Sequence, residues 1–171
     1  MGTVEKLDLG TARLSEAARI AEMSRRWIEQ GLTWRYRPHS IAGWIRDSET
    51  SVVVARAAGS VIGFAVMEFH FDAQRAHLVL LAVEPAYRRR GVGAALFRWL
   101  EKVACLGGIE RIRLELRADN EEARAFYERL EFRATELRRG YYNGEQDAIN
   151  MVRLIARGRH TGAGSCDSKP S

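Results

Sequence analysis

Residues 83–94 read Val-Glu-Pro-Ala-Tyr-Arg-Arg-Arg-Gly-Val-Gly-Ala, and this stretch indicates the fold more clearly than the rest of the chain. It follows an apolar run, and a series of strong helix formers starts at Ala94. The pattern therefore predicts a strand, a tight loop and the first turn of a helix. Free N–H groups and the positive end of a helix dipole meet at such a loop, and both favour a phosphate group. Because Arg88, Arg89 and Arg90 add positive charge, we expect a phosphorylated cofactor to bind here.

The composition is that of a globular protein with one core. The chain has 171 residues, of which 46% are hydrophobic and 29% charged, and we expect a single domain over residues 1–157. Residues 158–171 are rich in glycine and serine and are expected to be a disordered tail. Two cysteines are too few for a disulfide framework, and no run resembles a signal peptide or membrane span, so we expect a cytoplasmic protein without membrane contact. The net charge of +5 is spread over the whole chain, which favours an anionic cofactor over nucleic acid.

Periodicity and turn signals divide the chain into strands and helices. β-branched and alternating apolar runs predict strands, and apolar residues at helical spacing predict helices. The expected strands cover residues 4–9, 51–57, 61–69, 75–83, 111–117, 132–138 and 148–155, and the expected helices cover 14–28 (capped by Thr11), a short stretch after Pro38, 92–106, and a stretch capped by Asp119 or Asn120. This order predicts a mixed α/β sheet with helices on both faces. It excludes a doubly wound nucleotide-binding fold, because three consecutive strands precede the phosphate loop.

The glycine loop differs from two common phosphate-binding loops. It lacks the Gly-Lys-Ser/Thr ending of a nucleoside triphosphate loop, and Leu96 replaces the third glycine of a dinucleotide loop. The pattern Arg88-x-x-Gly91-x-Gly93 after an antiparallel-type strand instead resembles the pyrophosphate loop of the GNAT N-acetyltransferase superfamily, whose members bind acetyl-CoA.

The resemblance covers residues 50–154 and is closest to the bacterial ribosomal-protein N-terminal alanine acetyltransferases. It is carried by residues 82–85, 88–93, 114–120, 125–132, 138–142 and 147–151. It implies a GNAT fold, with a mixed, mostly antiparallel sheet of about seven strands flanked by about four helices, and an enzyme that uses acetyl-CoA as cosubstrate. Two positions depart from the branch, since Glu131 replaces a glycine and Asp119 replaces a small residue. Residues 1–49, where acceptors are usually recognised, show no comparable match.

Two backbone segments are expected to hold acetyl-CoA. The amides of residues 89–94 are placed to bind the pyrophosphate, because glycines allow close approach and amides need no particular side chain. The exposed strand edge before them can pair with the pantetheine arm as an added strand, and by resemblance an amide at or near its end polarises the thioester oxygen. Asn120 either caps its helix, binds pantetheine, or does both. The expected cofactor-binding residues are Leu81, Ala82, Val83, Arg88, Arg89, Arg90, Gly91, Val92, Gly93, Ala94, Asn120 and Tyr127.

Acetyl transfer to an amine needs a base for the ammonium proton and an acid for the leaving thiolate. By resemblance Tyr127 is the acid, and a phenol of ordinary pKa near ~10 matches an alkyl thiolate in basicity; the alternative is a packing aromatic. By resemblance Glu115 is the base, directly or through water, and the alternative is a surface carboxylate paired with Arg113 or Arg117. His77 is a rival base, because strand alternation places it on one face with Val79, Leu81 and Val83.

The acceptor is less defined by sequence than the donor. Trp34 and Tyr36 either line an acceptor groove or pack in the core, and Tyr141 and Tyr142 either contact the acceptor or belong to a plain hairpin. We expect a primary amine acceptor, first a protein N-terminal α-amine as in the ribosomal-protein branch. The alternatives are a small-molecule amine such as a polyamine, aminoglycoside or amino-acid-like toxin, and a non-catalytic acyl-CoA sensor. No histidine has metal-ligand spacing, so no metal is expected, and a homodimer is left open.

Overall fold

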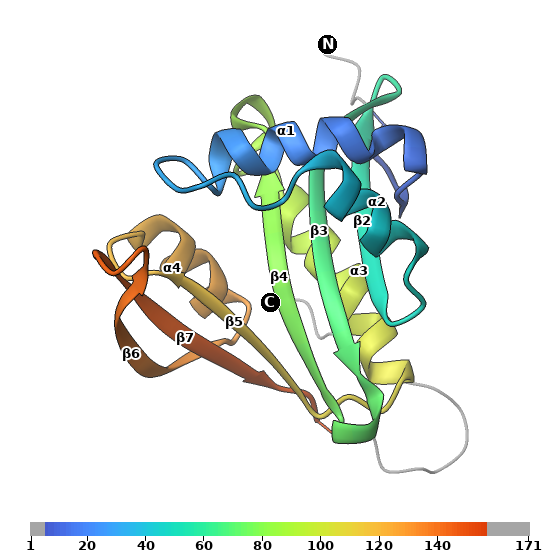
Figure 1. The fold of residues 1–171 in the computed structure, drawn as a ribbon. Coiled ribbons are helices and arrows are strands. Elements are labelled where there is room, and N and C mark those ends of the chain that lie inside the picture. The colour runs from blue at the N-terminus through green and yellow to red at the C-terminus, as the bar shows by residue number, and fades with distance from the viewer. Residues whose placement is uncertain (1–5, 157–171) are drawn as a thin grey trace.

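The computed structural model describes residues 6–156, which form a seven-stranded sheet with helices on both faces (Figure 1). The strand order is β1-β2-β3-β4-β5-β7-β6, and within the described residues only β4 and β5 pair in parallel. The strands are β1 (Asp8–Thr11), β2 (Thr50–Ala57), β3 (Ser60–His70), β4 (Arg75–Val83), β5 (Arg111–Arg117), β6 (Arg133–Tyr142) and β7 (Gln146–Leu154). The helices are α1 (Ala17–Trp27), α2 (Pro38–Arg46), α3 (Val92–Leu106) and α4 (Glu121–Arg129), with 3-10 turns at Leu14–Glu16, Phe71–Ala73 and Pro85–Tyr87. The predicted element order and the mixed, mostly antiparallel sheet are confirmed.

Two hydrophobic cores lie on opposite faces of the sheet. α1 and α2 cover one face, where Ile20 and Phe64 are fully buried. α3 and α4 cover the other face, where Phe97 and Ile112 are fully buried. β3 is buried along most of its length because both of its faces are covered, which explains its continuous apolar run. None of the helices between residues 6 and 156 is long and apolar enough to span a bilayer.

Several predicted boundaries shift in the structure. The first strand is Asp8–Thr11 instead of residues 4–9, of which 4 and 5 lie outside the described residues. Thr11 pairs with Val53 in the sheet and therefore caps no helix. The carboxylate of Glu16 caps the following 3-10 turn instead, by accepting a hydrogen bond from the Arg13 N–H at 2.7 Å. β6 extends beyond the predicted end at residue 138 to Tyr142, so Tyr141 and Tyr142 belong to the strand and the closing turn starts at Asn143. The tail predicted over residues 158–171 lies outside the described residues.

A bulge in β4 changes the side toward which its residues face. In the pairing with β3, Val66 lies opposite Leu80 and Met67 lies opposite Leu78, so Val79 is an extra residue. Leu78 accordingly belongs to the α3–α4 core, whereas Leu80 belongs to the α1–α2 core. One inserted residue is sufficient for this reversal because the side-chain period of a strand is two.

The bulge separates His77 from the end of β4. His77 lies before the bulge and faces the α1–α2 side, where it meets Glu68. Leu81 and Val83 lie after it and pack against the α3–α4 core. The prediction that His77, Val79, Leu81 and Val83 share one face is therefore wrong, because it assumed regular alternation.

β4 and β5 pair only at their first residues and then diverge. The pairing runs from Arg75 with Arg111 to His77 with Arg113. Beyond it the two strands separate, with α4 and the β6–β7 hairpin on the far side of the opening (Figure 1). The bulge follows the last pairing directly, and bulges increase local strand twist. The backbone of β4 after His77 thus has a free edge, among the described residues, on the side toward β5.

Arg56 fastens the N-terminal segment to the sheet, and its removal is expected to destabilise the fold. Its buried guanidinium donates two hydrogen bonds to the Glu16 carboxylate at 2.7 and 2.9 Å and one to the Thr11 carbonyl at 3.0 Å. Burial raises the pKa of Glu16, but the hydrogen bonds and charge of Arg56 outweigh it and hold that pKa below its ordinary value. Arg56→Met leaves Glu16 with an unpaired, largely buried charge, so we expect a loss of about 3 kcal/mol in the free energy of unfolding.

Urea denaturation at several pH values measures this effect. A carboxyl whose pKa is lowered in the folded state stabilises the fold above its unfolded pKa, and this stability is lost as the pH falls through the folded value. Acidification should therefore cost the wild type more stability than Arg56→Met. Arg124→Met, which breaks the exposed pair with Glu128, should change stability by about 0.5 kcal/mol or less. Equal stabilities of the two variants would contradict the assigned role of Arg56.

Candidate active site

The loop after β4 presents free backbone donors at the start of α3. Gly91 precedes the helix, and the first intrahelical bond runs from the Ala95 N–H to the Gly91 carbonyl at 3.0 Å. The N–H groups of Val92, Gly93 and Ala94 therefore lack an intrahelical acceptor and point out of the helix start. These donors and the positive end of the helix dipole suit a pyrophosphate.

The two glycines of the loop serve different structural purposes. Gly91 has φ +77°, a left-handed conformation that favours glycine. Gly93 lies in the helix, where an added Cβ would sit 3.1 Å from the Phe126 ring of α4. The sequence suggested glycines that let the backbone approach a ligand, and the structure adds the close packing of α3 on α4.

The arginines of the loop have separate surroundings. Arg88 turns back and donates its Nε–H to the Val83 carbonyl at 3.0 Å, which ties the loop to the end of β4. Arg90 lies over the ring of Tyr87, 5.5 Å from its centre. Arg89 has φ +59°, so the turn holds a second residue in the left-handed region. The groups available to bind a phosphate at this loop are therefore mainly backbone amides, and the arginine side chains contribute less.

The free edge of β4 offers backbone groups next to the cradle. The Glu84 N–H donates to the Ile62 carbonyl of the β3 end at 2.7 Å, so Glu84 faces β3. By the alternation of a strand, Ala82 also faces β3, while the N–H and carbonyl groups of Leu81 and Val83 face the opening. Of the three predicted residues of this edge, Leu81 and Val83 thus have backbone groups placed for an added strand, and Ala82 does not.

Tyr127 lies in α4 among aromatic rings on the α3–α4 side. Its ring packs edge-on against Phe126 and Phe132, with centroids 5.1 and 5.6 Å away. Burial raises the pKa of its phenol, which therefore keeps its proton at neutral pH. No residue between 6 and 156 hydrogen-bonds its hydroxyl. Asn120 caps the same helix by accepting a hydrogen bond from the Ala123 N–H at 3.0 Å, which confirms the predicted cap.

The two predicted bases are in direct contact. His77 Nε2 lies 2.6 Å from Glu115 Oε2, across the point where β4 and β5 begin to separate. Both side chains are largely buried, with 18% and 9% of their surfaces exposed. Glu115 also accepts a hydrogen bond from Arg113 at 2.5 Å, so the predicted Arg113 pairing and the His77 contact occur together. The sequence predicts one or the other as the base, whereas in the structure the two side chains are in contact.

The surroundings of Glu115 keep it ionised. Burial alone raises the pKa of this carboxyl, but the hydrogen bond and charge of His77 outweigh it. The charges of Arg113 and Arg138 act in the same direction, so the pKa lies below its ordinary value. The imidazole of His77 also faces Glu68, with Nδ1 3.8 Å from Oε2.

Tyr36 and Tyr142 come from opposite parts of the chain, and Tyr142 lies close enough to Glu115 for that charge to act on its phenol. Burial raises the pKa of Tyr36, which lies in the loop between α1 and α2 and packs 5.1 Å from the ring of Trp44. Burial, assisted by Tyr141 and Glu115, raises the pKa of Tyr142 to about 12. Trp34 packs against the α1–α2 core and is flanked by arginines, whereas 43% of Tyr141 is exposed.

The sequence reasoning missed two residues of this site, Glu68 and Glu29, and expected a third, Arg117, only as a partner of Glu115. Glu68 lies opposite His77 in the β3–β4 hairpin, and counting back from the turn identifies this pairing. Glu29 is buried and accepts hydrogen bonds from Ser24 Oγ and the Arg35 N–H, at 3.0 and 2.7 Å, which fixes the α1–α2 loop. Arg117 donates to the Gln30 carbonyl at 2.5 Å, and no local pattern indicates this contact because 87 residues separate the partners.

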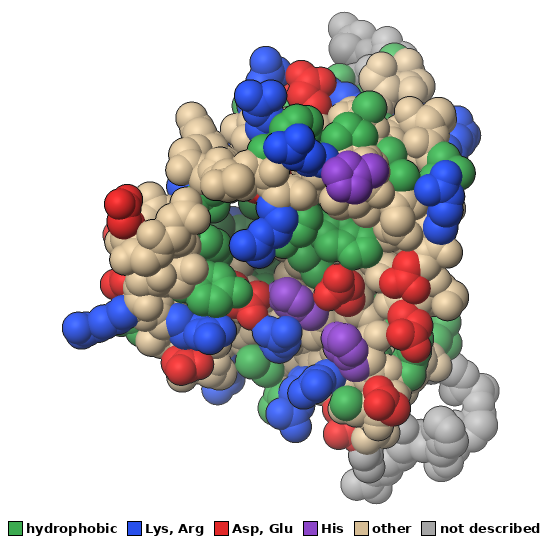
Figure 2. Space-filling view, viewed as in Figure 1, with side chains coloured by type: hydrophobic (Ala, Val, Ile, Leu, Met, Phe, Trp, Pro, Cys, Tyr) green, Lys and Arg blue, Asp and Glu red, His purple; other side chains and the backbone are tan. Residues whose placement is uncertain are grey.

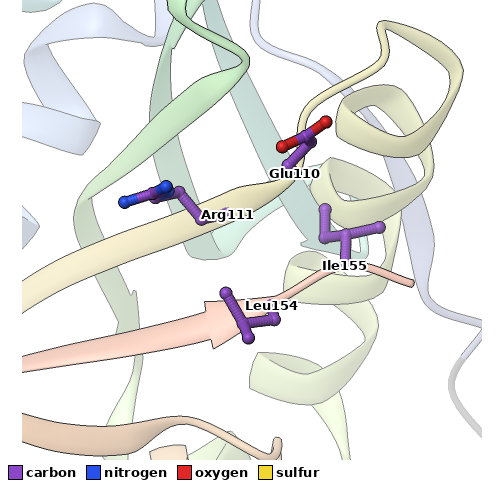
Figure 3. Close-up of a pocket in the computed structure, with 4 residues that line it drawn as sticks. All are labelled: Glu110, Arg111, Leu154 and Ile155. Atoms are coloured by element: carbon purple, nitrogen blue, oxygen red, sulfur yellow. The ribbon is translucent and has the colours of Figure 1, made fainter. Parts of the chain in front are cut away.

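A separate small pocket lies away from these groups. Glu110 and Arg111 line it from the start of β5, and Leu154 and Ile155 line it from the end of β7 (Figure 3). Its volume is about 210 Å³. It lies at the opposite end of β5 from Arg117 and holds none of the predicted site residues. Residues 6–156 contain no cluster of three or more histidine, cysteine or acidic residues suited to a metal.

A comparison with protein families explains this geometry. The model of the acetyltransferase (GNAT) family matches residues 16–132, which include the cradle, Glu115 and Tyr127. The chain is a GNAT acetyltransferase. The GNAT resemblance and the GNAT fold are thereby confirmed, and the protein is an acetyl-CoA-dependent N-acetyltransferase with acetyl-CoA as its acetyl donor.

This GNAT enzyme is similar to several individual proteins, two of which are named as N-acetyltransferases. The ribosomal protein bS18-alanine N-acetyltransferase of Escherichia coli strain K12 is 38% identical over 101 residues, covering 57% of this chain and 67% of the relative. The N-alpha-acetyltransferase RimI of Mycobacterium tuberculosis is 29% identical over 157 residues, covering 87% of this chain and 93% of the relative. The crystal structure of Ard1 from Thermoplasma volcanium superposes with a TM-score of 0.77 at 28% identity, covering 88% of this chain and 98% of that one.

Proposed function

We propose that this GNAT enzyme acetylates the α-amine of protein N-termini, with N-terminal alanine of a ribosomal protein as the first acceptor. The observation that carries the proposal is the buried contact between His77 and Glu115 at the opening of the sheet, flanked by Tyr36 and Tyr142. It supplies a base for an amine between two aromatic walls. The names of the two relatives in Escherichia coli and Mycobacterium tuberculosis support this class of acceptor.

Acetyl-CoA fits the free backbone groups of the loop before α3 and of the β4 edge. The N–H groups of Val92, Gly93 and Ala94 would hold the pyrophosphate, and the free edge at Leu81 would pair with the pantetheine arm. Bound acetyl-CoA supplies an activated thioester carbonyl. The free N–H at Val83 is the donor that would stabilise the developing negative charge on that carbonyl oxygen. Asn120 is engaged as a helix cap through Oδ1, which leaves its amide nitrogen for the cofactor.

Glu115, supported by His77, is the proposed base. The carboxylate accepts the proton that the acceptor ammonium loses, directly or through one water, and later releases it to solvent. The freed amine forms the new C–N bond and loses its second proton to solvent as the amide forms. The contact with His77 orients the carboxylate and stabilises its charge, so it stays ionised until an acceptor arrives. Because the pKa of Glu115 is low, its carboxylate is a weak base. It takes the ammonium proton favourably only as the acceptor amine attacks the thioester.

Tyr127 is the proposed acid. When the C–S bond breaks, the leaving thiolate takes the phenolic proton of Tyr127, and the phenol recovers a proton from solvent. Burial raises the pKa of Tyr127, and the same apolar surroundings raise the pKa of the leaving thiol. The two pKa values therefore rise together, and proton transfer from the phenol to the thiolate stays close to balanced. One chain supplies all of these groups, so the proposal does not require a homodimer. Newly made ribosomal proteins are cytoplasmic, and we place the enzyme there.

An acceptor screen tests the proposed function. We expect release of free CoA thiol with peptides that carry an N-terminal alanine, and a lower rate when the first residue is bulky or its amine is blocked. Polyamines, aminoglycosides and free amino acids are the control acceptors. Turnover of these small amines without turnover of any peptide would refute the proposal. CoA binding without turnover of any amine would indicate an acyl-CoA sensor.

A further inference from the structure

Around the proposed base, the carboxylates of Glu115 and Glu68 form an acidic floor, and arginines nearby form a basic rim. Glu115 and Glu68 face His77 at the floor, where an ammonium group is favoured. Figure 2 shows a hollow on this face, with Lys and Arg side chains beside Asp, Glu and His side chains next to it. The rim itself is built from two parts of the chain that are distant in sequence, the α1–α2 segment and the β5–β6 region.

The α1–α2 side of the rim is a hollow lined by arginines. Its volume is about 750 Å³, and Arg25, Arg26 and Arg37 are among its lining residues. The guanidinium groups of Arg25 and Arg37 lie over the ring of Trp34, 5.1 and 5.5 Å from its centre. An arginine held on an aromatic face keeps its N–H edge free for a carboxylate.

The carboxylates of this hollow do not neutralise those arginines. Glu22 pairs with Arg19, at 3.8 Å, on the next turn of α1. Glu29 is buried and engaged by Ser24 and by backbone N–H groups of the loop. Within residues 6–156, Arg25 and Arg37 therefore form no ion pair, although both are exposed.

The opposite side of the rim repeats the arrangement. Arg138 lies 4.9 Å from the ring centre of Tyr141, and Arg117 lies 6.0 Å from that of Tyr142. Neither arginine has an ion-pair partner in the described part of the chain. Arg117 also donates to the Gln30 carbonyl, so β5 and the α1–α2 loop meet here and the two groups of arginines lie on adjoining parts of the chain.

We propose that this arginine rim selects acceptors in which acidic residues follow the N-terminal amine. The amine is drawn to the carboxylates of the floor, and carboxylates at the next few positions meet unpaired guanidinium groups on both sides. Lysine or arginine at those positions would be repelled by the same groups. The inference rests on the proposed function and narrows it to acidic N-terminal segments.

The test compares two peptides of equal length that share an N-terminal alanine. Residues two to five are aspartate and glutamate in one peptide and lysine in the other. At low salt we expect the wild type to show a kcat/KM at least tenfold higher for the acidic peptide, with a ratio that shrinks as salt is added. In the double variant Arg25→Glu/Arg37→Glu the ratio should fall at least tenfold or invert. The matched control Arg98→Glu/Arg129→Glu changes the same charge at exposed positions of α3 and α4 and should leave the ratio unchanged.

The other possible results distinguish failure of this inference from failure of the proposed function. Equal rates for the two peptides, or a preference for the lysine peptide, overturn the inference while the proposed function stands. Turnover of small amines alone refutes the proposed function and this inference with it. Equal peptide rates, combined with salt-sensitive retention of a short oligonucleotide that the double variant loses, would assign the rim to nucleic acid and overturn the inference.

Discussion

We expect Tyr127→Phe to lower kcat by about a hundredfold or more and to leave the affinity for acetyl-CoA nearly unchanged. The substitution removes only the phenolic proton donor, and general acid catalysis contributes about 10²- to 10⁴-fold. The ring keeps its packing against Phe126 and Phe132, so the fold and the cofactor site are retained. Steady-state kinetics with an N-terminal alanine peptide measure the effect on turnover.

Binding and chemistry can be separated in this variant. Acetyl-CoA should raise the melting temperature of Tyr127→Phe as much as that of the wild type, because a ligand stabilises in proportion to its affinity. A variant with normal turnover would exclude Tyr127 as the acid and leave it a packing aromatic. A variant that loses both turnover and stabilisation by acetyl-CoA would show that the hydroxyl serves cofactor binding.

Sequence reasoning was most accurate where local signals mark both ends of an element. β4 has its predicted bounds, Arg75–Val83, because a turn precedes it and the Glu84-Pro85 pair ends it. α3 ends before the predicted glycine pair for the same reason, since Gly107 cannot continue the helix favourably. Turn and helix-stop residues of this kind act locally, so they can be interpreted without knowledge of the sheet.

The bulge in β4 could not be found in this way. Residues 78–83 are apolar without interruption because both faces of the sheet are covered, so the sequence carries no alternation that an extra residue could break. The inversion at Val79 is visible only in the pairing with β3. The arrangement of the site depends on it, since it turns His77 toward Glu115 and the end of β4 toward α3.

The contact between His77 and Glu115 shows a second limit of sequence reasoning. Both residues were selected, but as alternatives, because 38 positions separate them and their strands pair in parallel. A parallel pair is joined by a long crossover, here α3, and its register does not follow from counting across a turn. The antiparallel hairpin partner Glu68 could have been located by such counting.

Glu115→Gln is expected to lower kcat/KM for the peptide acceptor by about a hundredfold, because the amide keeps the shape of the side chain and cannot take the ammonium proton. In the wild type, Glu115 stays ionised at neutral pH because His77 and nearby arginines hold its pKa below the ordinary value. The acidic limb of the wild-type kcat/KM profile should therefore follow Glu115 and lie below the ordinary carboxyl pKa, whereas the basic limb should follow the α-amine of the acceptor, whose ordinary pKa is about 8.

His77→Gln tests the partnership at the same site. Removing the imidazole removes the main contact that lowers the pKa of Glu115, so this pKa rises. As the pH falls, the variant should lose activity at a higher pH than the wild type, as the carboxylate becomes protonated. Near pH 8 it should keep more activity than Glu115→Gln, since a carboxylate base is still present. A His77→Gln profile that matches the wild type would show that His77 does not affect the pKa of the base. A fully active Glu115→Gln would show that water, and not Glu115, accepts the ammonium proton.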